Sequence, residues 1–138
     1  MIAERPAAAP GILLIEDEQD IREFMQAGLE DAGLAVTAVA DGEQALTCAT
    51  AHRPAVVVLD MRLPGMTGED VAGRLRAVLG AALPIVVVTA VADPQERTER
   101  AGGLLYLRKP FEIDELVTAV RAVLSAVSPT ALAGRSHQ

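Results

Sequence analysis

Acidic side chains stand directly after two of the apolar runs in this sequence. Glu16 and Asp17 follow residues 12–15, and Asp60 follows residues 56–59. If both runs are parallel strands, these acids meet at one edge of the sheet, because the carboxyl ends of parallel strands lie together. Crowded carboxylates repel one another unless a cation neutralises them. Oxygen ligands completed by water are typical of Mg²⁺, whereas zinc prefers His or Cys, so the acids together favour a magnesium site.

Two further polar residues are predicted at the same edge. Thr89 ends the apolar run 85–88, and Lys109 follows the short run 104–107. A carboxylate nucleophile, a metal, an ammonium and a hydroxyl are the parts that stabilise a phosphoryl group during transfer, which depends mainly on positioning and electrostatics. Taken singly, each residue has a plainer interpretation, as a helix-capping acid, a β-branched strand residue or a surface lysine. The combination predicts a phosphoryl-transfer site.

Strand-like and helix-like patterns alternate along the chain. Short apolar runs rich in β-branched residues predict strands at 12–15, 34–39, 56–59, 85–88 and 104–107. Helical spacing of apolar residues predicts helices at 21–32, 42–51, 68–79 and 112–126, with a weaker candidate in the polar segment 93–100. Gly33 is well placed to end the first helix. This alternation predicts an α/β fold, a doubly wound parallel five-stranded sheet with helices on both faces.

Composition limits the classes of protein to which the chain can belong. With 138 residues and 51% hydrophobic content, one domain with a substantial core is expected, and we place it at 11–127 between a flexible lead-in (1–10) and a flexible tail (128–138). A net charge of -7 and 2% aromatic residues argue against direct nucleic acid binding, which calls for clustered basic residues or stacking platforms.

The same sequence argues against a membrane or secreted protein. No apolar run approaches the roughly 20 residues that a membrane-spanning helix needs. The one cysteine, Cys48, cannot form an internal disulfide, and its place among small apolar residues is typical of packing. We therefore expect a cytoplasmic protein without membrane association.

Four blocks of sequence, in order, resemble the signature blocks of response-regulator receiver domains of two-component systems. They are ILLIEDE (12–18), VVLDMRLPGMTG (57–68), VVTA (87–90) and YLRKPF (106–111). Each block alone is a weak signal, but four in order, with agreeing strand and helix placements, form a strong one. The resemblance implies a stand-alone receiver with a flavodoxin-like (βα)5 sheet of strand order 2-1-3-4-5.

The resemblance also implies a role for each residue of the site. Asp60 would be the phosphoacceptor. Mg²⁺, for which Mn²⁺ would be able to substitute, would be bound by Asp17, Asp60 and the Arg62 backbone carbonyl, and through water by Glu16. Thr89 and Lys109 would contact the phosphoryl oxygens. Tyr106 would form a conformational switch with Thr89, although a half-buried strand aromatic is the plainer interpretation, and the Lys109–Pro110 peptide would be cis.

By the same resemblance, the phosphoryl group would come from a sensor histidine kinase, a phosphotransfer protein or a small phosphodonor. The protein would catalyse only its own phosphorylation and dephosphorylation, and would signal to a separate protein partner; homodimer formation stays open. It would thus be a signalling switch rather than an enzyme that acts on an outside substrate.

Two departures from the family pattern keep other functions open. The segment between Thr89 and Lys109 is shorter than usual, which leaves a phosphorylation-independent interaction module with the receiver fold as the alternative. Leu104 and Leu105 occupy positions that are often acidic in the family, and we expect them to add to the core rather than mark a partner contact. A haloacid-dehalogenase-type phosphatase would need an Asp where Arg62 stands, and a flavin carrier would need more aromatic residues.

Overall fold

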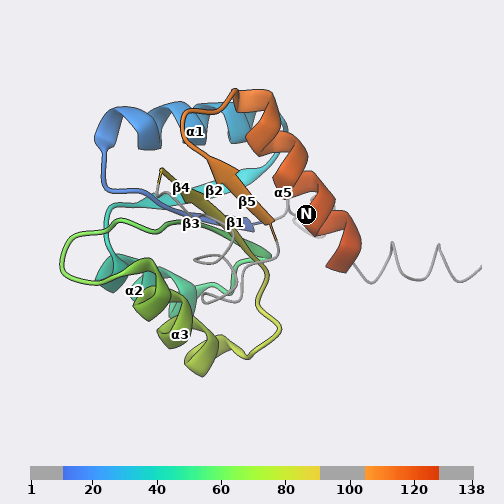
Figure 1. Ribbon diagram of the computed structural model, residues 1–138. Helices are drawn as coiled ribbons and strands as arrows, with labels where there is room; N and C mark the ends of the chain where they lie inside the picture. The colour runs from blue at the N-terminus through green and yellow to red at the C-terminus, as the bar shows by residue number, and fades with distance from the viewer. Residues whose placement is uncertain (1–10, 91–104, 128–138) are drawn as a thin grey trace, which may run out of the picture.

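A five-stranded parallel sheet forms the centre of the domain (Figure 1). The computed structural model describes residues 11–90 and 105–127. Its strands, in the spatial order β2-β1-β3-β4-β5, are β1 (Gly11–Ile15), β2 (Ala35–Val39), β3 (Val56–Asp60), β4 (Ile85–Thr89) and β5 (Leu105–Arg108). All four strand pairs are parallel. The predicted α/β fold with strand order 2-1-3-4-5 is confirmed.

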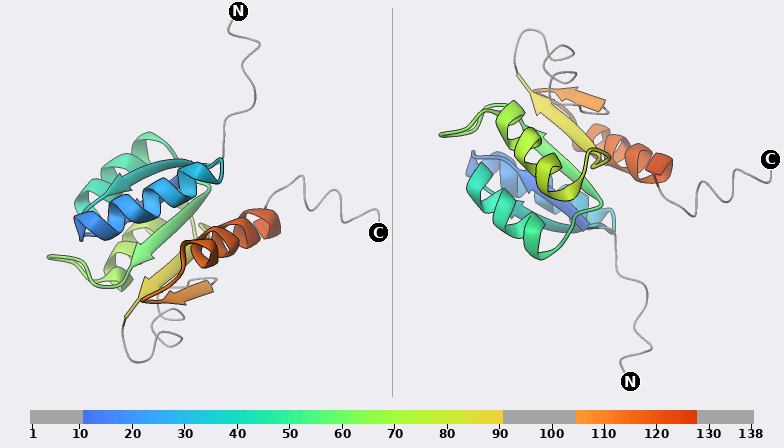
Figure 2. Two further views of the ribbon diagram at one scale, coloured as in Figure 1. Left: turned by 90° about the horizontal axis from the view of Figure 1, so that it is seen from above. Right: turned by 90° about the horizontal axis from the view of Figure 1, so that it is seen from below.

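Helices cover both faces of this sheet. In the described part of the chain they are α1 (Gln19–Asp31), α2 (Gly42–Ala51), α3 (Gly68–Leu79) and α5 (Ile113–Val127). Helices α1 and α5 lie together on one face, and α2 and α3 lie together on the other (Figures 1 and 2). This arrangement follows from right-handed crossovers between parallel strands.

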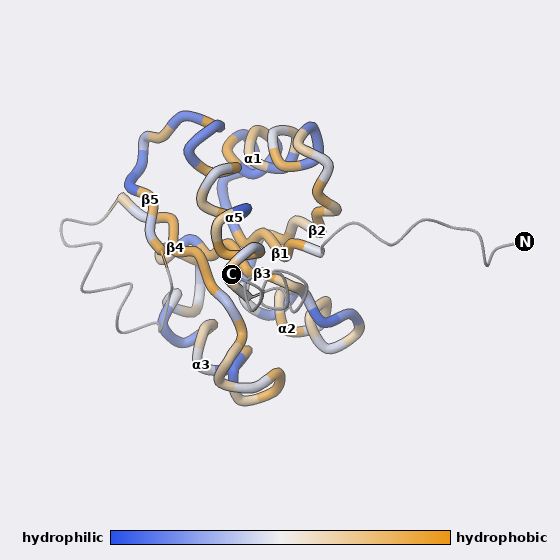
Figure 3. Tube along the Cα trace, turned by 90° about the vertical axis from the view of Figure 1, so that its right-hand side faces the viewer, coloured by the Kyte–Doolittle hydropathy of each residue, from blue (hydrophilic) through white to orange (hydrophobic). Residues whose placement is uncertain are grey.

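Side chains that alternate along the strands belong to two hydrophobic clusters, one on each face of the sheet. Leu13, Ile15 and Val57 pack toward α2 and α3, whereas Ile12 and Leu14 pack toward α1 and α5. Every residue of β3 and β4 is buried. The central strands are accordingly mostly hydrophobic in Figure 3 and in sequence carry a polar residue only at their last position, as expected for strands covered on both sides.

Local signals in the sequence explain where several helices begin and end. Asp41 caps α2 by accepting a hydrogen bond from the Gln44 amide at 2.8 Å, and Thr67 caps α3 in the same way. Gly33, predicted to end the first helix, follows α1 with φ of 91°, a conformation that favours glycine.

One burial prediction was wrong, and some predictions fall outside the described residues. Leu105 is 39% exposed on β5 rather than part of the core, because β5 is the last strand in the spatial order and its burial pattern is mostly exposed. Leu104, the weak helix candidate at 93–100, the lead-in and the tail all lie outside the described residues. Among the helices at 11–90 and 105–127, none is long and apolar enough to cross a membrane.

Candidate functional site

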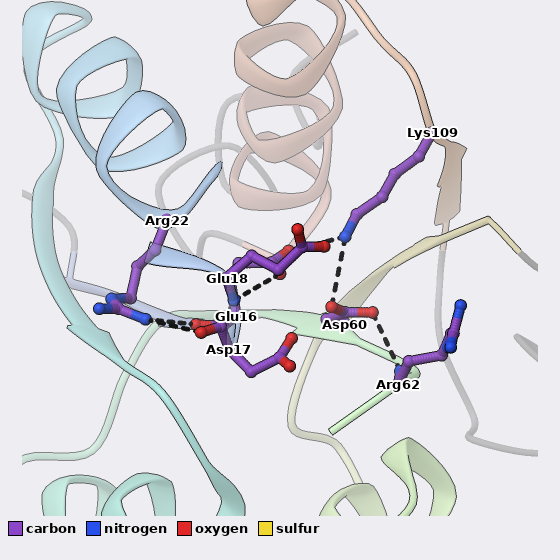
Figure 4. Close-up of polar contacts among 7 residues, drawn as sticks. All are labelled: Glu16, Asp17, Glu18, Arg22, Asp60, Arg62 and Lys109. Atoms are coloured by element: carbon purple, nitrogen blue, oxygen red, sulfur yellow. Dashed lines mark hydrogen bonds and ion pairs between the residues drawn. The ribbon is translucent and has the colours of Figure 1, made fainter. Parts of the chain in front are cut away.

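The predicted acidic residues meet at the carboxyl edge of the sheet. Glu16 follows β1, Asp17 is next to it, and Asp60 is the last residue of the neighbouring strand β3. One carboxylate oxygen from each of the three lies within 4.8 Å of the others. Glu16 is fully buried and Asp60 nearly so, whereas Asp17 is exposed at the mouth of the cluster (Figure 4).

Lys109 reaches into this cluster from the residue after β5. Its ammonium lies 2.9 Å from Glu16 Oε1 and 3.3 Å from Asp60 Oδ2, so it pairs with both buried carboxylates (Figure 4). The Lys109 backbone amide donates to the Thr89 carbonyl at 2.9 Å, which ties the end of β5 to the end of β4. The Lys109–Pro110 peptide bond is cis, the isomer that the family resemblance implies.

The loop after Asp60 wraps back toward its carboxylate. The Arg62 amide donates to Asp60 Oδ1 at 3.0 Å, and the Arg62 side chain is exposed. The Gly68 amide donates to the Met61 carbonyl at 3.2 Å, and a Cβ at Gly68 would lie only 2.7 Å from Met61 Cα. Backbone atoms therefore leave no room for a side chain at Gly68, and Gly65, at φ of 74°, supplies a left-handed turn residue in the same loop.

Thr89 and Tyr106 occupy neighbouring strands. Thr89 ends β4 and is fully buried, next to the strand that carries Asp60. Tyr106 on β5 pairs in register with Val87, two residues before Thr89, so both side chains point to the same face of the sheet. Tyr106 is 41% exposed. Its predicted coupling to Thr89 stays a prediction.

Burial and mutual repulsion change the proton affinities of this cluster. Burial raises the pKa of Glu16 to about 7, and the nearby negative charge of Asp60 adds to the rise, while the hydrogen bond from Lys109 opposes it. Burial of Lys109 favours its neutral form, but the hydrogen bond to Glu16 and the charge of Asp60 outweigh this and raise its pKa. The ammonium therefore stays charged at neutral pH. The site contains three carboxyl groups and only this one ammonium among the contacts described, so it can accommodate a further cation.

The donor set suits a small, hard cation. Two oxygens bound to one Mg²⁺ at about 2.1 Å can be at most about 4.2 Å apart, and a ligand held through water lies farther away. Three carboxylate oxygens within 4.8 Å fit a mixture of direct and water-mediated ligands. Soft ligands do not accompany them, since the described metal-ligating cluster contains only carboxylates.

Sequence reasoning missed one residue that contacts this site, Arg22 on the first turn of α1. Its guanidinium donates to the backbone carbonyls of Glu16 and Asp17 (Figure 4). The available signal was its position four residues after Glu18, which puts it on the helix turn nearest the acidic loop. A charged residue at such a position is otherwise an ordinary solvent-facing helix residue.

Comparison with known protein families agrees with this geometry. Residues 12–121 match the family described as the response regulator receiver domain. Response regulator MprA of Mycolicibacterium vanbaalenii is 38% identical to the chain over 91% of its length and over 54% of MprA. The chain spans about half the length of the curated relatives it matches.

Solved structures match along nearly their full length. The chemotaxis protein CheY4 of Vibrio cholerae is 29% identical, with a TM-score of 0.78, covering 84% of this chain and 99% of that one. The receiver domain of the sensor histidine kinase PA1611 of Pseudomonas aeruginosa, solved with a magnesium ion coordinated in its active site cleft, is 35% identical. Its TM-score is 0.77, and the match covers 85% of this chain and 98% of that one.

Proposed function

The chain belongs to the response regulator receiver domain family, and from this premise we propose that Asp60 accepts a phosphoryl group in a Mg²⁺-dependent reaction. The observation that carries the proposal is the convergence of Asp60, Asp17, Glu16 and Lys109, which come from three separate stretches of sequence, at one carboxyl edge.

The surroundings of Asp60 support its role as the nucleophile. One carboxylate oxygen accepts from the Arg62 amide and the other from Lys109, so the carboxylate is held in one orientation. In the proposed step, an Asp60 oxygen forms a bond to phosphorus while the nitrogen or oxygen of the donor leaves with its bonding electrons. Hydrolysis reverses the roles, with water attacking phosphorus and Asp60 leaving.

The remaining residues bind and orient. Asp17, Asp60 and the Arg62 carbonyl would hold the Mg²⁺ directly and Glu16 through water, and the bound ion supplies neutralisation of the carboxylates and of the phosphoryl oxygens. Lys109 lies 3.3 Å from Asp60, so its ammonium is within reach of a phosphoryl group attached there. The Thr89 hydroxyl would supply a further donor from the adjacent strand.

We further propose that phosphorylation is read through Thr89 and Tyr106. Tyr106 lies on the same face of the sheet as Thr89 and is partly exposed, so its side chain has room to change rotamer. A sensor histidine kinase or phosphotransfer protein would supply the phosphoryl group, and a partner protein would bind the altered surface.

The test is the intact mass of the protein after incubation with acetyl phosphate, with and without Mg²⁺. A phosphoryl adduct is expected only with Mg²⁺, and it should disappear in an Asp60→Asn variant, because an amide oxygen is a poor nucleophile. The matched control is Asp70→Asn, an exposed acid in α3 away from the site, which should be labelled like the wild type.

Either of two results would contradict the proposal. An adduct of equal yield on Asp60→Asn would place the phosphoryl group elsewhere. A wild-type protein that accepts no phosphoryl group from acetyl phosphate or from a phosphorylated histidine kinase would favour the interaction module instead.

A further inference from the structure

Arg22 makes three hydrogen bonds to the loop that carries two of the acids. Its guanidinium Nη1 donates to the Glu16 carbonyl at 2.9 Å and to the Asp17 carbonyl at 3.3 Å. Its own backbone amide donates to the Glu18 carbonyl at 2.8 Å. One residue therefore satisfies three consecutive carbonyl groups of residues 16–18, and Figure 4 shows the two bonds from its guanidinium.

The loop is also held by the Glu16 carboxylate and by the end of β2. The Glu18 amide donates to Glu16 Oε2 at 3.2 Å, and the Glu16 amide donates to the Val39 carbonyl at 3.1 Å. The loop is thus bonded both by the buried Glu16 carboxylate and by the Arg22 side chain. With these bonds in place, its backbone has little freedom to move Asp17 relative to Asp60.

Asp17 depends on this support more than its neighbours do. It is exposed, whereas Glu16 and Asp60 are buried and paired with Lys109. Its carboxylate is therefore positioned mainly through its backbone, which Arg22 contacts at the Asp17 carbonyl.

We propose that Arg22 is a positioning residue for the metal site, which holds the loop at residues 16–18 so that Asp17 faces Asp60 at the distance a shared Mg²⁺ requires. The inference rests on the proposed function, because it needs the acidic cluster to bind Mg²⁺. Residues that orient metal ligands in this way typically affect metal affinity 10- to 100-fold.

The direction in which Mg²⁺ affinity changes when the Arg22 side chain is removed distinguishes a positioning role from a purely electrostatic one. A guanidinium near an acidic cluster repels a metal cation, so its removal should tighten Mg²⁺ binding if charge were its only contribution. Loss of loop support predicts the reverse. An Arg22→Ala variant should bind Mg²⁺ with a Kd about tenfold higher than the wild type.

The experiment measures Mg²⁺ binding by isothermal titration calorimetry, at a temperature where circular dichroism shows each variant fully folded. Arg121→Ala is the matched control, because Arg121 also donates from its guanidinium to a backbone carbonyl, that of Ala32, at the other end of α1. Its Kd should equal that of the wild type. Arg22→Lys keeps one donor of similar reach and should restore part of the affinity.

The outcomes separate the two hypotheses. A wild-type protein that does not bind Mg²⁺ would overturn the proposed function and this inference with it. Mg²⁺ binding by the wild type, with equal or tighter binding by Arg22→Ala, would overturn the positioning role alone. Equal weakening in Arg22→Ala and Arg121→Ala would also overturn it, because the effect would then reflect general loosening of α1.

Discussion

At the scale of single residues, the Lys109 ammonium shares the site with the cation that the acids are expected to bind. The Lys109 side chain is 16% exposed, and its ammonium contacts the side chains of Glu16 and Asp60, which are 0% and 5% exposed. Without a metal it is the cation that the structure shows paired to these buried acids. With a metal, it adds a second positive charge near the same oxygens.

Replacement of Lys109 by Met should therefore separate stability, metal binding and chemistry. Without Mg²⁺, Lys109→Met should lose about 3 kcal/mol of unfolding free energy, since a buried charge pair loses one partner. Mg²⁺ should bind more tightly than to the wild type, because a competing cation is gone. Phosphorylation should nevertheless slow, because the phosphoryl oxygens lose their ammonium.

Urea denaturation, titration calorimetry and labelling with acetyl phosphate measure these three effects on the same variant. Arg108→Met is the control, because Arg108 is the last residue of β5, directly before Lys109, and its side chain is exposed. Weaker Mg²⁺ binding by Lys109→Met would show that the ammonium supports the metal site instead of competing with it.

At the scale of elements, the loop between β3 and α3 depends on one close approach. A Cβ at Gly68 would meet the sulfur of Met61 at 2.6 Å and its Cα at 2.7 Å, and the second of these is backbone, which cannot move aside cheaply. Gly73, five residues later in the same helix, has no atom within 4 Å of the position that a Cβ would take.

The two glycines should therefore respond oppositely to alanine. Gly68→Ala should destabilise the domain by about 1–3 kcal/mol through overpacking, and should weaken Mg²⁺ binding by moving the Arg62 backbone. Gly73→Ala should stabilise it by up to about 1 kcal/mol, because alanine is the better helix former. Urea denaturation of both variants measures the difference, and equal stabilities would contradict the steric role of Gly68.

The sequence predicted the elements better than it predicted contacts between them. The β-branched runs and turn residues placed all five strands within one or two residues, and the positions of Asp17, Asp60 and Lys109 next to strand ends predicted that they meet at one edge. Local signals of this kind depend only on neighbours in the chain. Asp60, for example, was expected directly after the third strand and is its last residue.

Contacts that depend on how the elements pack were not predicted from the sequence. The double pairing of Lys109, the two carbonyl bonds of Arg22 and the exposure of Leu105 all depend on how elements pack. Leu105 shows the difficulty plainly. An apolar residue in a strand is usually buried, but β5 ends the spatial order of the sheet and its side chains are mostly exposed.

At the scale of the whole molecule, proton binding at Glu16 is linked to the stability of the fold. The folded protein raises the pKa of this carboxyl from 4.5 to about 7, so between those values it binds a proton more tightly than the unfolded chain does. The stabilising contribution of this group is complete below about pH 4.5 and is lost as the pH rises through about 7.

The metal-free domain should accordingly have a component of stability that decreases from pH 4.5 to 7. Glu16→Gln, which cannot ionise, should remove that component, whereas Glu18→Gln at the exposed neighbour should retain it. Saturating Mg²⁺ should also remove it, because a bound metal favours the ionised carboxylate. Urea denaturation across this range is the measurement, and an unchanged pH dependence in Glu16→Gln would refute the linkage.

Because the strands are buried to different extents, we expect the sheet to resist displacement more strongly at its centre than at β5. Asp60 sits on β3, and β3 and β4 are buried throughout, so a displacement there is resisted by packing on both faces. β5 is mostly exposed, yet the Lys109 amide bonds it to Thr89 at 2.9 Å. Elements with few buried contacts move at the lowest free-energy cost. We therefore expect a displacement that begins at the centre of the sheet to be expressed at β5, where few side chains are buried.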